Sequence, residues 1–413
     1  MIDRDAPATR RTHAFILAGG QGERLQPLTM ARPKPAVSFG GMFRIIDFTL
    51  SNCLHSGVNR VSVLTQYKHE ELHRYVREGW HDLWSGGSPH RSPLTCVPPA
   101  SGKRYRGTAD AVFQNAELLN DDAEFVLVLS GDHIYQMDYR DLLRRHIETS
   151  ADLTIATVEH PIRDASNFGV VQVDGNFRVT GFEEKPENPR SLPSDSSMAL
   201  VNMGVYVFTK AALMSALTSI CDCGRGIDFG HDVIPVLIHS ARTFAYDFRN
   251  KTQDRPQYWR DIGTIDAYYQ ASMDLVRFNP LFDPYLSDSS TSLPTRHPTT
   301  HALRARVHSD SRVAQSVISP SVRIDARAQV NGAILLPGVR VGKGAQLRHA
   351  IVEEGVEVPA GFDAGFDLDH DRQHHTVTDS GIVVVSRTPT KTEPVVLRFT
   401  FTSADGGATL TTA

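Results

Sequence analysis

Short apolar runs recur along the first two thirds of the chain and alternate with stretches of helix-like pattern. Apolar runs of this length are typical of strands that lie buried in a sheet. Strands that alternate with helices along a chain indicate an open α/β sheet. This pattern extends to about Phe282 and predicts strands at residues 14–17, 61–64, 125–129, 153–158 and 205–208.

The pattern changes after residue 282. Residues 283–310 are rich in Ser, Thr and Pro, which is typical of a surface linker. Beyond them a six-residue apolar period predicts a left-handed or parallel β-helix over residues 311–402. Residues 403–413 are low in complexity, which predicts a disordered tail. The period runs through Ile318, Ile324 and Val330 and, after a one-residue shift, through Leu335, Val341 and Leu347.

An ordinary sheet segment is the alternative to this β-helix. The glycines between the apolar positions, and the pair Pro337-Gly338, favour the β-helix because they suit tight corners. A short β-helix exposes its ends, and a second subunit would cover them. We therefore expect a homo-oligomer.

Composition narrows the class of protein. The 413 residues include 43 basic and 47 acidic side chains, with a net charge of -4. Such a balance argues against a nucleic-acid or membrane-surface partner. Residues 1–12 lack the apolar core of a secretory signal, and no run is long enough for a membrane span. The four cysteines are too few for a disulfide framework, so we expect a cytoplasmic protein.

The run Leu17-Ala18-Gly19-Gly20-Gln21-Gly22-Glu23-Arg24-Leu25 joins a glycine turn to an arginine, directly after an apolar strand. Glycines let backbone N–H groups approach phosphate oxygens, and a guanidinium can bind those oxygens in a bidentate way. We expect the turn to open a helix whose N-terminus attracts anions. A dinucleotide fingerprint would need a third glycine and a P-loop would need Gly-Lys-Ser/Thr. The run therefore indicates a nucleoside triphosphate, with a plain structural turn as the alternative.

Two carboxylates are candidates for a metal site. Asp132 follows the apolar strand at residues 125–129, and ligands bind at that end of parallel strands. Asp261 precedes a glycine turn. Two carboxylates together with phosphate oxygens are a typical Mg²⁺ site. Each aspartate alone could be a turn residue. His133 is interpreted as a structural neighbour, because no set of spaced His or Cys residues accompanies it.

Two lysines stand beside prolines. Lys34 lies between Pro33 and Pro35, which restrict the backbone and so limit where the ammonium can go. A charge fixed in this way suits a leaving group. Lys185 precedes a proline, and its neighbour Glu184 could accept hydrogen bonds from a polyol. A single exposed lysine is more often simply solvated.

The chain resembles the bacterial glucose-1-phosphate adenylyltransferases, also called ADP-glucose pyrophosphorylases. The resemblance covers the predicted α/β domain and continues into the six-residue repeats. It rests on the segments at residues 17–20, 34–37, 43–48, 50–53, 65–67, 105–112, 131–135, 168–170, 184–186, 228–230 and 258–261.

This resemblance implies a nucleotide-diphospho-sugar transferase fold (Rossmann-like α/β) followed by a left-handed parallel β-helix. It also implies the reaction of ATP with α-glucose 1-phosphate to give ADP-glucose and pyrophosphate, in α-glucan synthesis. Arg24, Lys34 and Asp132 would be catalytic, and Asp132 and Asp261 would hold Mg²⁺. The family further implies a homotetramer and small-molecule effectors. The implied ATP site is Leu17, Ala18, Gly19, Gly20, Gly22, Gln66, Tyr105, Gly107, Thr108 and Ala109, and the implied glucose 1-phosphate site is Gly169, Glu184, Lys185, Asn202 and Asp228.

The chain departs from the family pattern at four positions. Asn202 replaces a serine and His231 a lysine, both near the implied sugar site. An asparagine can still bond a hydroxyl, so glucose stays the expected sugar. Ala31 and Arg104 replace the lysine and tryptophan of members activated by fructose 1,6-bisphosphate, which argues against that effector.

Three other functions stay open. A uridylyl- or thymidylyltransferase would share the glycine turn, aspartates and lysines. A non-catalytic regulatory subunit should have lost Arg24, Lys34 or Asp132, all of which are present. A hexapeptide acyltransferase would need a catalytic histidine in the coils, and His349 has no clear carboxylate partner in sequence.

Overall fold

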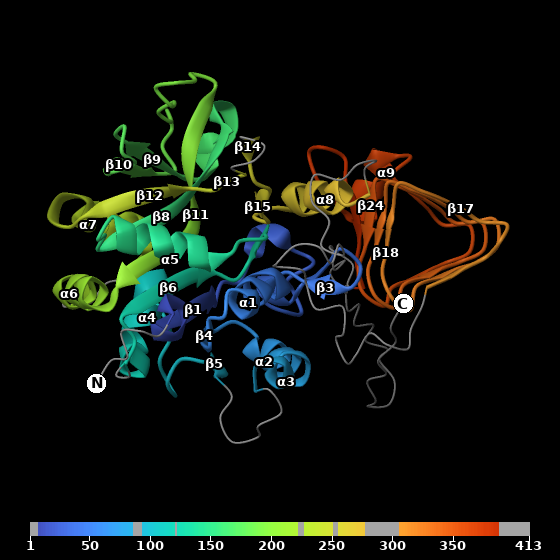
Figure 1. Cartoon of the computed structure of the whole chain (residues 1–413). Coiled ribbons are helices and arrows are strands. Elements are labelled where there is room, and N and C mark those ends of the chain that lie inside the picture. Colours follow the sequence, from blue (N-terminus) through green and yellow to red (C-terminus); the bar gives the residue numbers. More distant parts are fainter. Residues whose placement is uncertain are drawn as a thin grey trace, which may run out of the picture.

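The computed structural model describes residues 7–85, 93–119, 122–221, 227–250, 255–276 and 305–387, which build an α/β domain beside a β-helix (Figure 1). The α/β domain holds a nine-stranded sheet. Its strands β1, β4, β5 and β6 are parallel, and β11 joins β6 in the antiparallel direction. The sheet consists of β1 (Thr12–Ala18), β4 (Arg60–Thr65), β5 (Leu94–Val97), β6 (Phe125–Ser130), β8 (Leu153–Pro161), β9 (Gly169–Val173), β10 (Val179–Glu184), β11 (Met198–Thr209) and β12 (Thr243–Asp247).

Strand β1 shows why the sheet needs helices on both faces. Successive side chains of a strand point to opposite faces. Ala14, Ile16 and Ala18 pack into one core, with side chains from the helices α1 (Ile46–His55), α2 (His69–Gly79) and α5 (Tyr139–Glu148). Phe15 packs into a second core on the other face, with side chains from the helices α4 (Thr108–Gln114), α6 (Lys210–Cys221) and α7 (Ile234–Ser240). Continuous apolar runs such as residues 14–17 therefore form central strands, as predicted.

The helices of the α/β domain lie between its strands in the chain or after the last of them, and β8 to β11 follow one another without an α-helix. They are α1 (Ile46–His55), α2 (His69–Gly79), α3 (His81–Ser85), α4 (Thr108–Gln114), α5 (Tyr139–Glu148), α6 (Lys210–Cys221), α7 (Ile234–Ser240) and α8 (Ile265–Asp274). Short turns of 3-10 or π type lie at Ala8–Arg11, Glu23–Leu25, Lys34–Ala36, Ala116–Leu119, Ile162–Asn167 and Phe229–Val233. Paired short strands are β2 (Ser38–Phe39) with β3 (Phe43–Arg44), β7 (His133–Tyr135) with β15 (Trp259–Asp261), and β13 (Arg249–Asn250) with β14 (Arg255–Pro256).

The helix expected after the glycine turn is not formed, so that prediction is wrong. The turn leads only into the 3-10 turn η2 (Glu23–Leu25). Gln26 is extended, with φ -59° and ψ 141°. It precedes Pro27, and a residue before proline is driven away from the helical region. Phosphate binding at this turn would therefore use loop N–H groups and side chains, without a helix dipole.

The C-terminal part is a parallel β-helix with three sheet faces (Figure 1). Ile318 pairs with Leu335, Ile324 with Val341 and Val330 with Leu347, so residues six apart fall on successive faces. The predicted left-handed β-helix class is confirmed. The faces are β16 (Arg306–Val307), β19 (Arg323–Ile324), β22 (Arg340–Val341) and β25 (Glu357–Val358); β17 (Arg312–Ala314), β20 (Gln329–Asn331), β23 (Gln346–Arg348) and β26 (Asp363–Ala364); and β18 (Val317–Ile318), β21 (Ile334–Leu335), β24 (Ala350–Val352), β28 (Val383–Val385) and β27 (Thr376–Val377), with α9 (Leu368–His374).

The β-helix begins before the predicted boundary at residue 311. Strand β16 already pairs with β19, so residues 306–310 belong to the first coil rather than to the predicted linker 283–310. Most of that linker, the end of the predicted α/β domain at 282, the end of the predicted β-helix at 402 and the predicted tail 403–413 lie outside the described residues. Within the described ranges, no helix has the length and apolar character needed to cross a membrane.

The two parts of the chain share one apolar core. Ile265, Tyr268 and Tyr269 of α8 lie in the same cluster as Ile334 and Ile351 of the β-helix. The Tyr269 hydroxyl also donates to the Gly332 carbonyl at 2.6 Å. An apolar contact of this kind resembles a single core more than a mobile domain interface. The β-helix therefore packs firmly on α8.

We expect Ile351→Ala to lower the free energy of unfolding by about 2–5 kcal/mol, because it opens a cavity in this shared core. Ile351 is fully buried, whereas Ile147 on α5 is 43% exposed and serves as the control. Ile147→Ala should change the stability by less than about 0.5 kcal/mol. Urea unfolding followed by fluorescence measures both, and equal stability of the two variants would contradict the shared core.

Candidate functional site

Two hollows meet at the carboxyl ends of β1 and β6. One has a volume of about 420 Å³ and the other about 510 Å³. Leu17, Gly20, Arg24, Lys34 and Asp132 line both, so the hollows form one continuous cleft. The cleft also includes these further predicted residues: Ala18, Gly19, Gly22, Gln66, Tyr105, Gly107, Thr108, Asp228 and Asp261.

The glycine turn is held by its own packing. Gly22 has a φ of +67°, which side chains rarely allow, and a Cβ there would lie 3.0 Å from Lys34 Cβ. The Thr29 hydroxyl donates to the Gly22 carbonyl at 2.8 Å. Gly20 is different, since a Cβ there would meet nothing within 4 Å. Gly22 therefore shapes the turn, and Gly20 leaves its backbone open to the cleft.

The ammonium of Lys34 lies between the two predicted metal-binding carboxylates. Nζ is 2.8 Å from Asp132 Oδ2 and 3.2 Å from Asp261 Oδ1. Lys34 stands on the short turn η3 (Lys34–Ala36), and only 9% of its side chain is exposed. The pinned lysine predicted from the flanking prolines is thus a buried one.

Mutual attraction outweighs burial in this group. Burial alone would lower the pKa of Lys34, but Asp132 and Asp261 outweigh it and the pKa of the ammonium is raised. Burial alone would raise the pKa of Asp132, but Lys34 and His133 outweigh it and the pKa of this carboxyl is lowered. Opposite charges at these distances favour the charged forms. The cleft therefore carries an ammonium beside ionised Asp132 at neutral pH.

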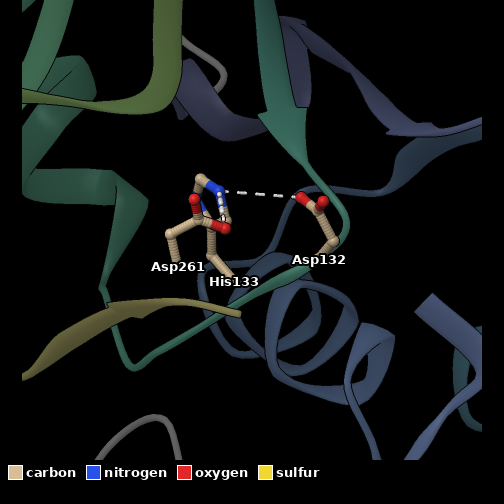
Figure 2. A group of neighbouring side chains, drawn as sticks. All are labelled: Asp132, His133 and Asp261. Atoms are coloured by element: carbon tan, nitrogen blue, oxygen red, sulfur yellow. Dashed lines mark ion pairs between the residues drawn. The ribbon is translucent and has the colours of Figure 1, made fainter. Parts of the chain in front are cut away.

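His133 belongs to the same group and is more than the structural neighbour that the sequence predicts. Its Nε2 atom faces both carboxylates, 3.6 Å from Asp132 Oδ1 and 3.5 Å from Asp261 Oδ1 (Figure 2). The pairing of β7 with β15 sets His133 opposite Asp261. Sequence alone could not reveal this, since the two strands lie far apart in the chain. The available signal was the position of His133 next to Asp132.

The predicted nucleotide side is built around Gln66 and Gly107. The Gln66 side chain pairs with both backbone groups of Tyr105, accepting from its N–H and donating to its carbonyl. Thr108 donates to Asp228 Oδ1 at 2.9 Å through both N–H and hydroxyl. Asp228 thus holds the N-terminus of α4 while lining the cleft. Ala109, which is predicted to belong to the ATP site, is fully buried and does not belong to the described lining of the cleft.

Gly107 is needed for packing. A Cβ at this position would lie 2.3 Å from the Ile227 carbonyl oxygen. Its φ of 160° is ordinary extended backbone, so the demand comes from space alone. The glycine allows the loop to approach the backbone of residue 227, which precedes Asp228.

The predicted sugar-phosphate residues lie beyond the described lining of the cleft, except Asp228. Glu184 lies against Gly230, two residues from Asp228, because a Cβ on Gly230 would lie 2.6 Å from Glu184 Oε2. Gly169 leaves room for the same carboxylate, since a Cβ there would lie 2.8 Å from that oxygen. Lys185 has a 57% exposed side chain with Nζ 3.8 Å from Glu184 Oε1. Lys185 therefore lies beside Glu184, which packs against Gly230.

Asn202, predicted to bind the sugar, makes two hydrogen bonds within its own strand. Its amide donates to the Tyr206 hydroxyl at 2.7 Å, and its side-chain oxygen accepts from the Gly204 N–H at 3.0 Å. Pairing of β11 with β8 is irregular between Asn202 and Tyr206. Gly204 has a φ of +66° there. In the described structure Asn202 therefore holds a bulge of β11.

Comparison with known proteins agrees with this geometry. The family described as "Nucleotidyl transferase" matches residues 13–277, and the family "GlmU-like, C-terminal hexapeptide" matches residues 303–385. A glucose-1-phosphate adenylyltransferase of Methylobacillus flagellatus is 40% identical over 92% of this chain and 94% of its own. The chain belongs to the glucose-1-phosphate adenylyltransferase family.

Other members of the family are equally similar. The glucose-1-phosphate adenylyltransferase of Nitrosomonas europaea is 42% identical over 92% of this chain and 93% of its own. Glucose-1-phosphate adenylyltransferase 2 of Vibrio parahaemolyticus is 44% identical over 90% of this chain and 97% of its own. The resemblance read from the motifs is therefore confirmed along both parts of the chain.

Glycines 107 and 20 allow a matched test of the cleft geometry. We expect Gly107→Ala to destabilise the protein by about 1–3 kcal/mol, because forced overpacking costs that much. Gly20→Ala enters open space and should leave the melting temperature within about 2 °C of the unmutated protein. Thermal unfolding followed by circular dichroism measures both. Equal melting temperatures of the two variants would contradict the close contact between Gly107 and the Ile227 carbonyl.

Proposed function

We propose that this chain transfers the adenylyl group of ATP to α-glucose 1-phosphate, releasing pyrophosphate and forming ADP-glucose. The observation that carries the proposal is the cleft in which a glycine turn, Arg24 and Lys34 face Asp132 and Asp261. Two polyanions must meet there, and cationic side chains offset their charge. Its relatives carry the name of this reaction.

Catalysis in this cleft would depend on placement and charge. A phosphate oxygen of the sugar would attack the α-phosphorus of ATP, with pyrophosphate leaving on the opposite side. Open backbone at Gly20 would receive phosphate oxygens, and Arg24 would bind the triphosphate. Lys34 would stabilise the departing pyrophosphate. Near Asp228, Lys185 would bind the phosphate of the sugar while Glu184 accepts from its hydroxyls.

The residues fit a divalent cation, and we propose Mg²⁺. Asp132 and Asp261 offer carboxylate oxygens, the hard ligands that Mg²⁺ prefers, and ligand atoms of this group converge within 4.8 Å. A bound Mg²⁺ would neutralise phosphate charge as the bond to pyrophosphate breaks. In this structure the Lys34 ammonium contacts the same two carboxylates. When the cation binds them, the ammonium would turn toward the phosphates.

The remaining expectations are part of this proposal. A homotetramer agrees with the first coil of the β-helix, where Val307 and Val313 are 50% and 37% exposed on strands at the end of their sheets. Metabolite effectors, a cytoplasmic location and a role in α-glucan synthesis follow from the family resemblance. A non-catalytic subunit is disfavoured, because Arg24, Lys34 and Asp132 line one cleft.

Pyrophosphate release tests the reaction directly. With ATP, UTP, dTTP, CTP or GTP against several sugar 1-phosphates, we expect release with ATP and α-glucose 1-phosphate. Asp132→Asn should lose about a thousandfold in kcat, since a preorganised charge contact contributes that much. Activity with UTP or dTTP but not ATP would contradict the proposed nucleotide. Unchanged kcat in Asp132→Asn would contradict the role of the carboxylate.

Lys185 tests the sugar-phosphate side separately. We expect Lys185→Ala to raise KM for glucose 1-phosphate about 10- to 100-fold, because a hydrogen bond to a charged group contributes roughly 1.5–3 kcal/mol. KM for ATP should change little. Lys343→Ala, which alters an exposed lysine of the β-helix, is the control. A larger effect of Lys185→Ala on ATP than on the sugar phosphate would place Lys185 at the wrong substrate.

A further inference from the structure

His133 takes no part in the transfer described so far, yet it faces the carboxylates more directly than a packing residue needs to. Among the described residues, Asp132, His133 and Asp261 form a group of metal-ligand side chains whose ligand atoms all lie within 4.8 Å of one another. Bonds from divalent ions to such ligands are about 2.1 Å long, so atoms this close can approach one ion together. The group therefore offers a nitrogen besides two carboxylates.

A backbone hydrogen bond fixes the orientation of the imidazole. His133 Nδ1 is 3.0 Å from the carbonyl oxygen of Met203 on β11. A carbonyl only accepts, so Nδ1 carries the proton and donates. In the neutral ring the lone pair is then on Nε2, the atom that faces both carboxylates (Figure 2). Metal-binding histidines typically use one nitrogen for the ion and donate the other to a carbonyl or carboxylate.

Packing keeps the ring in this orientation. The ring edge meets the Trp259 ring at a centroid distance of 5.3 Å, and 12% of the side chain is exposed. Trp259 and Asp261 lie on the same strand, β15, which pairs with β7. The imidazole is therefore held by β11 on one side and β15 on the other. Such support is what a ligand needs to stay in place without its ion.

Lys34 shares only part of this position, since it and His133 approach the same oxygen of Asp261, Oδ1, but different oxygens of Asp132. Its Nζ bonds Asp132 through Oδ2, whereas His133 approaches the same carboxylate through Oδ1. The Oδ1 atoms of Asp132 and Asp261 and the lone pair of His133 Nε2 would repel one another without a positive charge nearby. The Lys34 ammonium supplies that charge in this structure. Once Lys34 turns toward substrate phosphates, three acceptors remain.

We propose that His133, through Nε2, is a third protein ligand of the divalent cation in this cleft. The inference rests on the proposed function only for the presence of a cation there. Imidazole suits transition ions, whereas Mg²⁺ usually binds one or two carboxylates, phosphates and water. His133 thus makes this site accept Mn²⁺ or Co²⁺ better than carboxylates alone would.

Pulsed electron paramagnetic resonance tests the ligand itself. The unmutated protein is loaded with Mn²⁺ and inorganic pyrophosphate, which contains no nitrogen, and the electron spin echo is examined for modulation by a directly bound ¹⁴N. We expect imidazole modulation, which changes to the ¹⁵N pattern when histidine is labelled with ¹⁵N. Both signals should vanish in His133→Gln.

His160 provides a matched control. It too has Nδ1 near a backbone carbonyl, that of Pro161, and a ring against Phe168, but it does not belong to the carboxylate group. His160→Gln should keep the modulation. By calorimetry, His133→Gln should lower the preference for Co²⁺ over Mg²⁺ about tenfold. His160→Gln should leave that preference unchanged.

The contrary results are distinct. Bound Mn²⁺ without nitrogen modulation in the unmutated protein would overturn the proposal, because it would show that Nε2 does not bind the ion. Failure to bind Mn²⁺ would overturn it as well. The unmutated protein suffices for both, even if His133→Gln fails to fold. Nitrogen coordination in a protein that makes no ADP-glucose would leave the ligand in place and contradict the proposed reaction alone.

Discussion

The attraction of one buried ammonium to two carboxylates is the interaction on which the site depends. Asp132 and Asp261 are brought together in a cleft where their charges would repel each other and any phosphate that approached. The Lys34 ammonium, 2.8 Å from Asp132 and 3.2 Å from Asp261, offsets part of this negative charge. The Lys34 ammonium can bind the phosphates of a substrate instead, provided that another cation takes its place beside Asp132 and Asp261. Both the proposed transfer and the proposed ligand His133 depend on this exchange of the Lys34 ammonium for a divalent cation.

The shared apolar core explains how these groups are held in register. Three polar residues of the cleft are followed in the chain by an apolar residue that packs into that core: Leu25 follows Arg24, Ile134 follows His133 and Ile262 follows Asp261. The β-helix completes the core from the other side. It therefore supports the cleft without contributing to its lining among the described residues.

Much of this architecture could be predicted because repeated burial leaves a repeated pattern. Residues 125–129 formed the predicted strand, and Asp132 followed at its carboxyl end. Contacts between distant segments left no such pattern. His133 is positioned by the pairing of β7 with β15, and the Asn202 side chain donates to the Tyr206 hydroxyl across a bulge of β11. The expected helix after the glycine turn failed because Pro27 restricts Gln26, a local signal that could have been used.

Binding of Mn²⁺ to the protein without nucleotide tests the role of Lys34 most directly. If the ammonium holds the place of a cation, Lys34→Gln should bind Mn²⁺ about tenfold more tightly than the unmutated protein, because a charge in direct contact is removed. Arg24→Gln removes a charge from the same cleft without a described ion pair to the carboxylates, and the gain should stay below about threefold. Equal Mn²⁺ affinity of Lys34→Gln and the unmutated protein would contradict the account.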